Sequence, residues 1–264
     1  MYRMPKQLKI PIRSLGSEVE DPSISALSVW IATHRGIEAD LITYKLEESI
    51  RVQKEVDIPA AGGRFYGSHL SSSLVGTEEG ILVEEPAVDL RFVSEDTTRI
   101  ITLRKGAWSS LPAPHLWEVK DRYFDNRDEF QTALCQCAVH LMRAMRDKGI
   151  AGHILLCDTM LEEELELLSG PKVVWYSEKP GVEDLSLLLE RHRTIAVPSD
   201  HLSLVIELLS EFEVDHLIVV DPNAHALSQV QSHFDPEAIL VGGYCKGKCS
   251  EYWSHLRESA HLIQ

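Results

Sequence analysis

From residue 152 onward, short apolar runs alternate with segments of helical length, and this alternation constrains the fold more than any other feature of the chain. The runs are almost continuously apolar and rich in Val and Ile, which is typical of strands covered by helices on both faces. Each intervening segment is long enough for one crossover helix, so the pattern predicts an α/β fold with a parallel sheet of about five strands. The expected strands are residues 154–157, 173–176, 194–197, 217–220 and 239–241.

Helices are expected around these strands. A long helix should run from Asn126 to Gly149, because Asn126 and Glu129 have the spacing of a capping box and one apolar face continues along the segment. The amphipathic tail should pack on the sheet as a helix, with Trp253 in the core or at a dimer contact, so a homo-oligomer is compatible with the sequence. The expected crossover helices are residues 160–168, 182–189, 202–212 and 224–230.

The first part of the chain has a different period. Apolar and polar residues alternate in several short segments, which predicts strands. One helix is expected after Asp21, because Asp21 can cap it and Pro22 suits its first position. The expected strands are residues 42–46, 88–93 and 99–104.

A domain boundary is expected near residue 112, where two prolines mark a connection between elements. Before it, Gly62 and Gly63 predict a hairpin connection, with a phosphate-cradling loop as the alternative. We therefore expect a β-rich α+β domain at residues 1–112, followed by the parallel α/β domain at residues 113–264.

The charge balance argues against a nucleic-acid partner. The chain carries 41 acidic and 26 basic residues, a formal net charge of −15, whereas contact with a phosphate backbone needs clustered Lys and Arg. The most basic stretches, Lys6 to Arg13 and residues 143–148, are interpreted as solvated surface.

The remaining composition predicts a cytoplasmic protein. No apolar segment approaches the ~20 residues that a membrane span requires, so no membrane association is expected. The five cysteines are an odd number at spacings that do not suggest a secreted disulfide framework. We therefore expect them to be reduced thiols.

Polar residues follow the predicted strands where ligands bind in open parallel sheets, outside the carboxyl ends of the strands. Asp158 follows the first strand, Ser199 and Asp200 the third, and Asp221 the fourth. The three aspartates are candidate catalytic groups that orient a hydroxyl or act as a base, and Ser199 is a candidate ligand contact. The alternative for Asp158, Ser199 and Asp221 is plain capping of the helices that follow.

The last strand runs into a segment where glycines, lysines and cysteines meet. Gly242, Gly243 and Lys246 are expected to bind an anion, because glycine allows close backbone approach and lysine supplies charge. Cys245 and Cys249 have a spacing seen at zinc sites, although no second ligand pair is evident. A reactive or redox-active thiol pair and two ordinary thiols are the alternatives.

This segment also carries a resemblance to a known family. The strand that ends in Gly242-Gly243, with polar loops after the two preceding strands, resembles the ligand edge of knotted SPOUT-type methyltransferases over residues 194–257. The resemblance implies methyl transfer, S-adenosylmethionine as the cofactor and a knotted arrangement of the last strands.

Together these features favour an α/β enzyme over two alternatives. The favoured function is group transfer, methyltransferase-like, on a small anionic or nucleotide-like ligand at the carboxyl ends of the parallel strands. The first alternative is a non-catalytic metal-binding or redox-sensing module built on the cysteine pair. The second is an interaction protein that uses the β-rich first domain as its working surface.

Overall fold

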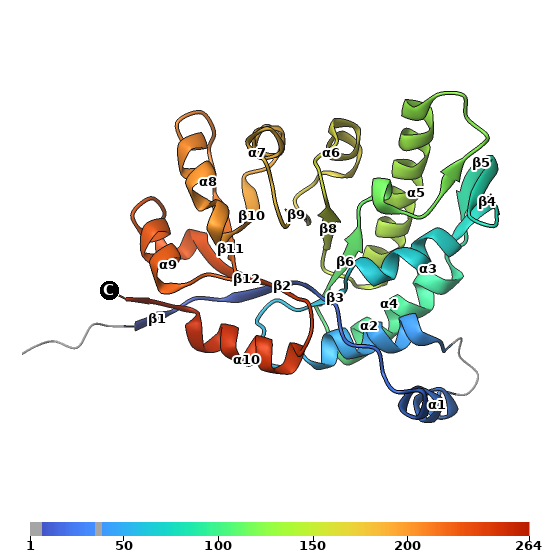
Figure 1. The fold of residues 1–264 in the computed structure, drawn as a ribbon, viewed down its shortest axis with the longest axis horizontal. Helices are drawn as coiled ribbons and strands as arrows, with labels where there is room; N and C mark the ends of the chain where they lie inside the picture. Colours follow the sequence, from blue (N-terminus) through green and yellow to red (C-terminus); the bar gives the residue numbers. More distant parts are fainter. Residues whose placement is uncertain (1–6, 35–38, 264) are drawn as a thin grey trace, which may run out of the picture.

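The computed structural model describes residues 7–34 and 39–263 (Figure 1). Its main strands form two four-stranded parallel sheets, in the orders β10-β11-β12-β2 and β3-β6-β8-β9. The strands are β2 (Ile12–Ser17), β3 (Ala60–Gly62), β6 (Trp108–Pro112), β8 (His153–Cys157), β9 (Val173–Ser177), β10 (Thr194–Pro198), β11 (His216–Val220) and β12 (Ile239–Cys245).

The two sheets meet along both edges and close into one barrel. At one junction β2 lies beside β3, where the Ser14 amide donates to the Ile58 carbonyl at 2.9 Å. At the other, β9 lies beside β10. Eight parallel strands with helices around them are the architecture of a (β/α)8 barrel.

Helices surround the barrel strands, with α5 to α8 above them and α2 and α10 below them in Figure 1. The predicted α/β fold with parallel strands and crossover helices is therefore confirmed. The helices are α1 (Ile24–Thr33), α2 (Leu41–Arg51), α3 (Gly67–Ser72), α4 (Arg91–Leu103), α5 (Arg127–Lys148), α6 (Glu162–Leu168), α7 (Val182–Leu189), α8 (Leu202–Leu208), α9 (Ala224–Gln231) and α10 (Cys249–Ser259).

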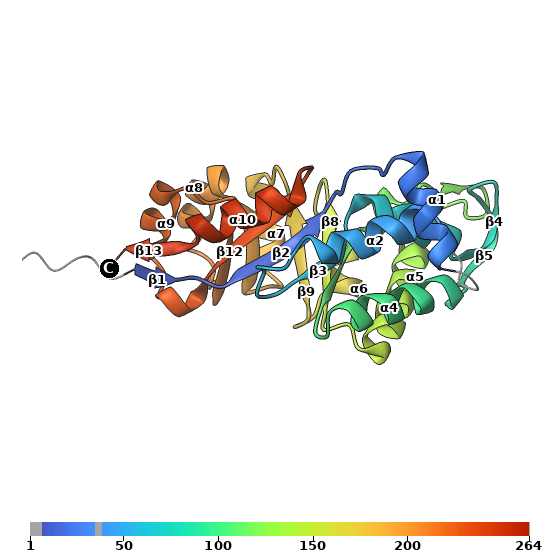
Figure 2. The same ribbon diagram turned by 90° about the horizontal axis from the view of Figure 1, so that it is seen from below.

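Two small sheets lie outside the barrel. In one, β1 (Gln7–Lys9) pairs with β13 (His261–Ile263), so the two ends of the described chain lie side by side (Figure 2). The other joins β4 (Leu74–Glu78), β5 (Ile81–Val88) and β7 (Lys120–Asp121). No helix within the described residues is both long and apolar enough to cross a membrane.

The barrel strands bury both of their faces, which explains their near-continuous apolar runs. Outward-facing side chains pack under the helices in the large core, and inward-facing side chains fill the barrel itself. The inward set is Leu15, Ala60, Ile154, Leu156, Val174, Tyr176, Ala196, Ile218, Val220 and Tyr244, with Trp108 and Leu240 packed against it.

Helix ends follow the local sequence closely. The Asn126 side chain accepts a hydrogen bond from the Asp128 amide at 2.9 Å, and Gly149 ends α5 with a φ of 120°. The long helix is thus confirmed. The helix after Asp21 is also present as α1, but its cap is Ser23, whose Oγ accepts from the Ala26 amide at 3.2 Å.

The predicted strands in the first part of the chain are wrong. Residues 42–46 lie in α2, residues 99–104 lie mostly in α4, and residues 88–93 span the end of β5 and the start of α4. Asp40 caps α2 by accepting from the Thr43 amide at 2.8 Å. Burial of one face of each helix outweighs the strand preference of the β-branched residues.

Sheet pairing crosses the predicted boundary at residue 112. β6 pairs with β8, and β12 pairs with β2, so residues from both predicted domains share both sheets. The segment before Gly63 is also no hairpin connection, because it forms the barrel strand β3. These early strands are short and rich in Ser, Gly and Ala, and therefore lack the Val and Ile runs that mark the later strands.

Candidate functional site

Charged and phenolic side chains gather where the barrel strands end. All strands of a parallel barrel end at the same mouth, which is where the active sites of such enzymes lie. Six charged members follow the ends of β2, β3, β8, β9, β11 and β12, two tyrosines lie near the ends of β9 and β12, and one tyrosine lies on α10. We call this group the mouth cluster, and its members are Glu18, Arg64, Asp158, Tyr176, Glu178, Asp221, Tyr244, Lys246 and Tyr252.

Two tyrosines form the floor of the mouth cluster. The ring centroids of Tyr176 and Tyr244 lie 5.8 Å apart, and both residues are buried at the top of the barrel interior. Burial raises the pKa of both phenols, and Asp221 and Glu178 add to the effect at Tyr176. Both phenols are therefore protonated at neutral pH and able to donate hydrogen bonds.

Glu18 connects the ends of three strands. Its carboxylate accepts hydrogen bonds from the Tyr244 hydroxyl and from the Arg64 amide, the latter at 2.5 Å. Gly63 makes this approach possible, since a Cβ at that position would lie 2.6 Å from Glu18 Oε1. The close contact fixes where the Arg64 side chain begins.

Two ion pairs lie across the mouth. Arg64 Nη2 contacts Asp158 Oδ1 at 2.6 Å, and Lys246 Nζ contacts a carboxylate oxygen of Glu178. The side chains of Asp158 and Lys246 are 65% and 61% exposed. Exposed ion pairs contribute only about 0–1 kcal/mol, so a ligand can replace one partner at small cost.

Asp221 is the most unusual carboxylate of the cluster. Its Oδ1 accepts from the Tyr252 hydroxyl at 2.5 Å, and its φ of 49° lies in the left-handed region, which is rare outside glycine. Burial of the carboxyl raises its pKa, while the Tyr252 hydrogen bond and Lys246 oppose that shift. A strained residue with a raised carboxyl pKa is a candidate for proton transfer.

The structure brings most of the sequence-predicted site residues to this mouth. Asp158, Asp221 and Lys246 belong to the cluster, and the Ser199 hydroxyl donates to the Asp221 carbonyl at 2.9 Å. Asp200 is exposed beside them and contacts His201 Nδ1 at 2.8 Å.

Helix capping does not explain these positions. The caps of α6 and α9 are Leu161 and Asn223, so Asp158 and Asp221 do not cap the helices that follow them. Ser199 makes no side-chain cap either, because its hydroxyl bonds the next strand end. The capping alternative for these three residues is therefore wrong.

The two glycines of β12 lie within the strand and are buried, directly before Tyr244 of the mouth cluster. A Cβ on Gly242 would lie 2.6 Å from Ile218 inside the barrel. A Cβ on Gly243 would lie 2.5 Å from the hydroxyl of Tyr252, a member of the mouth cluster, and 2.8 Å from the Trp253 ring on α10. Both glycines thus allow close packing beside the mouth cluster, and ligand binding by Gly242 and Gly243 stays a prediction.

Cys245 and Cys249 form a disulfide that links the end of β12 to the start of α10. This differs from the expectation that all five cysteines are thiols. A disulfide sulfur is not the thiolate that binds zinc. Within the described part of the chain, no three His, Cys, Asp or Glu residues are grouped to hold a metal ion, so the pair does not fit a zinc site.

The disulfide predicts a thiol count. Protein purified without reductant and denatured should be alkylated at the buried Cys135, Cys137 and Cys157 only. After reduction, Cys245 and Cys249 should react as well. Intact mass spectrometry would count the adducts, and five adducts without reductant would contradict a disulfide in solution.

Sequence reasoning missed several members of the cluster, including Glu18, Arg64 and Glu178. Glu178 directly follows the second predicted strand, so the strand-end rule alone points to it. Glu18 and Arg64 follow strands that the sequence does not reveal, β2 and β3. Tyr176 and Tyr244 have the strand alternation that directs them into the barrel, but only closure of the sheet brings them together.

The strand order does not fit the knotted methyltransferase resemblance. β10, β11 and β12 are neighbours in sequential order, and β2 completes the sheet beside β12. A sequential order with outer helices as connections contains no knot. The S-adenosylmethionine site implied by that resemblance therefore has no structural support here.

No protein-family model matches this sequence, and no curated protein matches it by sequence. Solved structures do match in fold. A B12-independent methionine synthase from Shewanella sp. W3-18-1 in complex with selenomethionine has a TM-score of 0.58 at 13% identity, covering 96% of both chains. A putative vitamin-B12 independent methionine synthase from Listeria monocytogenes has a TM-score of 0.58 at 12% identity, also covering 96% of both chains.

A methyltransferase from Methanosarcina mazei matches with a TM-score of 0.50 at 11% identity, covering 95% of this chain and 94% of that one. Identities this low establish a shared fold and leave activity to be argued from the site. The chain therefore has the barrel fold of methionine synthase and methyltransferase structures over nearly its whole length.

Proposed function

We propose that this protein is a group-transfer enzyme that binds a small amino-acid-like ligand in the mouth cluster. The observation that carries the proposal is the convergence of charged side chains from six strand ends on the carboxyl-end mouth of the barrel. Active sites of characterised (β/α)8 enzymes lie at that end. The fold shared with methionine synthase and methyltransferase structures supports the choice of reaction class.

The balance of charges indicates the ligand. The mouth offers two cations, Arg64 and Lys246, but more carboxylates than these two can neutralise. A purely anionic ligand would meet net repulsion. A zwitterion with one carboxylate and one ammonium group matches both kinds of side chain.

Each charged group of the ligand has a suitable partner. The planar guanidinium of Arg64 can exchange Asp158 for the ligand carboxylate, which it would bind in two-point fashion. Asp221 and Arg64 both lie close enough to Tyr176 to act on the pKa of its phenol, which Asp221 raises and Arg64 lowers. Asp221 would then hold the ammonium group or accept its proton, with Tyr252 keeping the carboxylate oriented.

A binding experiment tests this proposal. Calorimetric titration with the standard amino acids is expected to find at least one ligand, whose methyl ester and N-acetyl derivative bind more weakly. Arg64→Met should weaken binding by at least about tenfold, because a hydrogen-bonded charge pair is lost. Asp221→Asn should weaken binding of the parent amino acid more than it weakens binding of the N-acetyl derivative, which has no ammonium group.

Arg127→Met is the matched control, since it removes the same side chain at an exposed position on α5. It is expected to bind as the wild type does. If no amino acid binds, or if Arg64→Met and Arg127→Met bind alike, the mouth cluster is not the site of such a ligand.

A further inference from the structure

The end of the barrel opposite the mouth contains a cavity, which no part of the proposed function uses. It has a volume of about 690 Å³ and opens where the strands begin. Trp108, Thr194 and His216 are the first residues of β6, β10 and β11, and all three line it. Arg13, the second residue of β2, enters it from the barrel wall.

Arg13 is buried with two of its guanidinium nitrogen atoms unpaired in the described part of the chain. The residue is 7% exposed, and its Nε and Nη2 atoms have no hydrogen-bond partner within residues 7–34 and 39–263. The sequence prediction of a solvated Arg13 is therefore wrong, while Lys6, at the start of that basic stretch, lies outside the described residues. The alternation that directs Leu15 into the barrel directs Arg13 inward as well.

The Arg13 side chain is held by an aromatic face. Its guanidinium carbon lies 3.8 Å from the centroid of the Trp108 ring, a cation–π contact that fixes the plane of the guanidinium. Burial lowers the pKa of Arg13 to about 10, and no carboxylate offsets that shift. A buried charge without hydrogen bonds is costly, so the cation needs a partner that the described residues do not supply.

The lining of the cavity contains more basic than acidic residues. Its lining includes three arginines, Arg13, Arg191 and Arg193, against one carboxylate, Asp215. The two outer arginines are exposed and reach acidic residues outside the lining, Glu162 at 3.6 Å and Glu213 at 2.9 Å. Both outer arginines are therefore ion-paired, and of the three arginines only Arg13 has no ion pair within the described residues.

We propose that this cavity is a binding site for a small oxyanion, a phosphate or carboxylate group, received by the Arg13 guanidinium. The guanidinium fork matches either group by two parallel N–H donors. Trp108 holds the fork in one orientation, and Arg191 and Arg193 line the same cavity. The cavity is large enough for a small organic molecule that carries the anionic group.

Titration of the full chain with inorganic phosphate and with succinate tests the site and distinguishes a phosphate ligand from a carboxylate ligand. At least one of them is expected to raise the melting temperature saturably, beyond potassium chloride at equal ionic strength. Calorimetry should give a dissociation constant that rises at least about tenfold in Arg13→Met, since the charged hydrogen bonds are lost. Arg13→Lys keeps the charge but loses the fork and should bind with intermediate strength.

A matched variant locates the effect. Arg127→Met removes an exposed arginine on α5 and should bind the anion as the wild type does. The proposal is overturned if neither anion exceeds chloride in the wild type. Equal binding by Arg13→Met or Arg13→Lys and Arg127→Met would overturn it as well. If Arg13→Met does not fold, Arg13→Lys and the wild-type titration decide.

Discussion

Replacing Asp96 with asparagine is expected to lower the free energy of unfolding by about 3 kcal/mol, because it removes the charge from a buried ion pair. Asp96 lies on α4 with its side chain 4% exposed. Its Oδ2 accepts from the Tyr66 hydroxyl at 2.8 Å and contacts His69 Nδ1 at 3.0 Å. Without that charge, His69 retains only Asp40, whose side chain is 54% exposed.

The same cluster makes stability depend on pH in a defined direction. Burial alone would lower the pKa of His69, but hydrogen bonds to Asp40 and Asp96 raise it to about 9 in the folded state. A raised pKa means that the folded state holds the proton more tightly. The stabilisation is therefore complete below pH 6.5 or so, the unfolded value, and is lost as pH rises through about 9.

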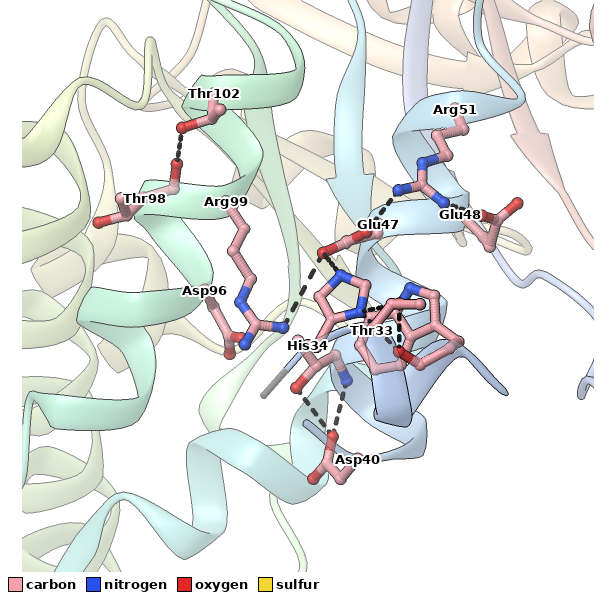
Figure 3. A network of polar contacts seen from close by, with 12 residues as sticks. Thr33, His34, Asp40, Glu47, Glu48, Arg51, Asp96, Thr98, Arg99 and Thr102 are labelled. Carbon is pink, nitrogen blue, oxygen red and sulfur yellow. Dashed lines mark hydrogen bonds and ion pairs between the residues drawn. The ribbon is translucent and has the colours of Figure 1, made fainter. Parts of the chain in front are cut away.

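The acid side has the opposite sign. Burial would raise the pKa of Asp40, but hydrogen bonds from His69 and Thr43 lower it well below its ordinary value. That contribution is complete above the ordinary pKa of about 3.8 and is lost as pH falls below it. Asp40 and Asp96 belong to a polar network around α2 and α4 that also joins Glu47 to Arg99 (Figure 3).

Urea denaturation at pH 6 and at pH 9.5 measures the alkaline limb. The wild type should lose about 2 kcal/mol between them, after allowance for solvent screening at the half-exposed Asp40. The Asp96→Asn variant should lose clearly less free energy of unfolding between these two pH values, since His69 no longer has two charged partners. Asp147→Asn, the same change at an exposed position of α5, should follow the wild type. Parallel pH profiles for Asp96→Asn and wild type would show that His69 is not charged in the folded protein.

The strands in the second half of the barrel could be predicted because each one can be recognised from its own residues. Residues 217–220 illustrate this: four consecutive apolar residues, buried on both faces, are bounded by polar residues that end the strand. The rule that polar residues gather after such strands then predicts Asp158, Asp221 and Lys246. These three lie together at the mouth.

The first half could not be predicted because its strands depend on their neighbours. β3 is Ala60–Gly62, three residues with almost no side chain, and it is a strand only because β6 and β2 lie on either side of it. With β2 and β3 unrecognised, Glu18 and Arg64 had no strand end to follow. The prediction of a solvated Arg13 fails for the same reason, since only a closed barrel buries this residue.

Gly62 is where this dependence can be tested most sharply, because Gly62→Ala should destabilise the barrel by more than about 3 kcal/mol. Its φ is +99°, and a Cβ would lie 2.4 Å from the carbonyl oxygen of Ser110 on β6. That oxygen belongs to the backbone of the neighbouring strand, so it cannot move aside as a flexible side chain would. The Gly62 amide is also tied to the Ser49 hydroxyl at 3.0 Å, which limits relaxation in the other direction.

Gly106→Ala is the matched control for this change. Gly106 also has a positive φ, +75°, but a Cβ there would meet nothing within 4 Å. It should therefore cost only the conformational penalty, about 1 kcal/mol. Urea denaturation of both variants separates the two effects. Equal losses of unfolding free energy in the two variants would mean that β3 and β6 are free to separate. Arg64 lies two residues beyond Gly62, so it would then have no fixed position from which to bind a ligand at the mouth.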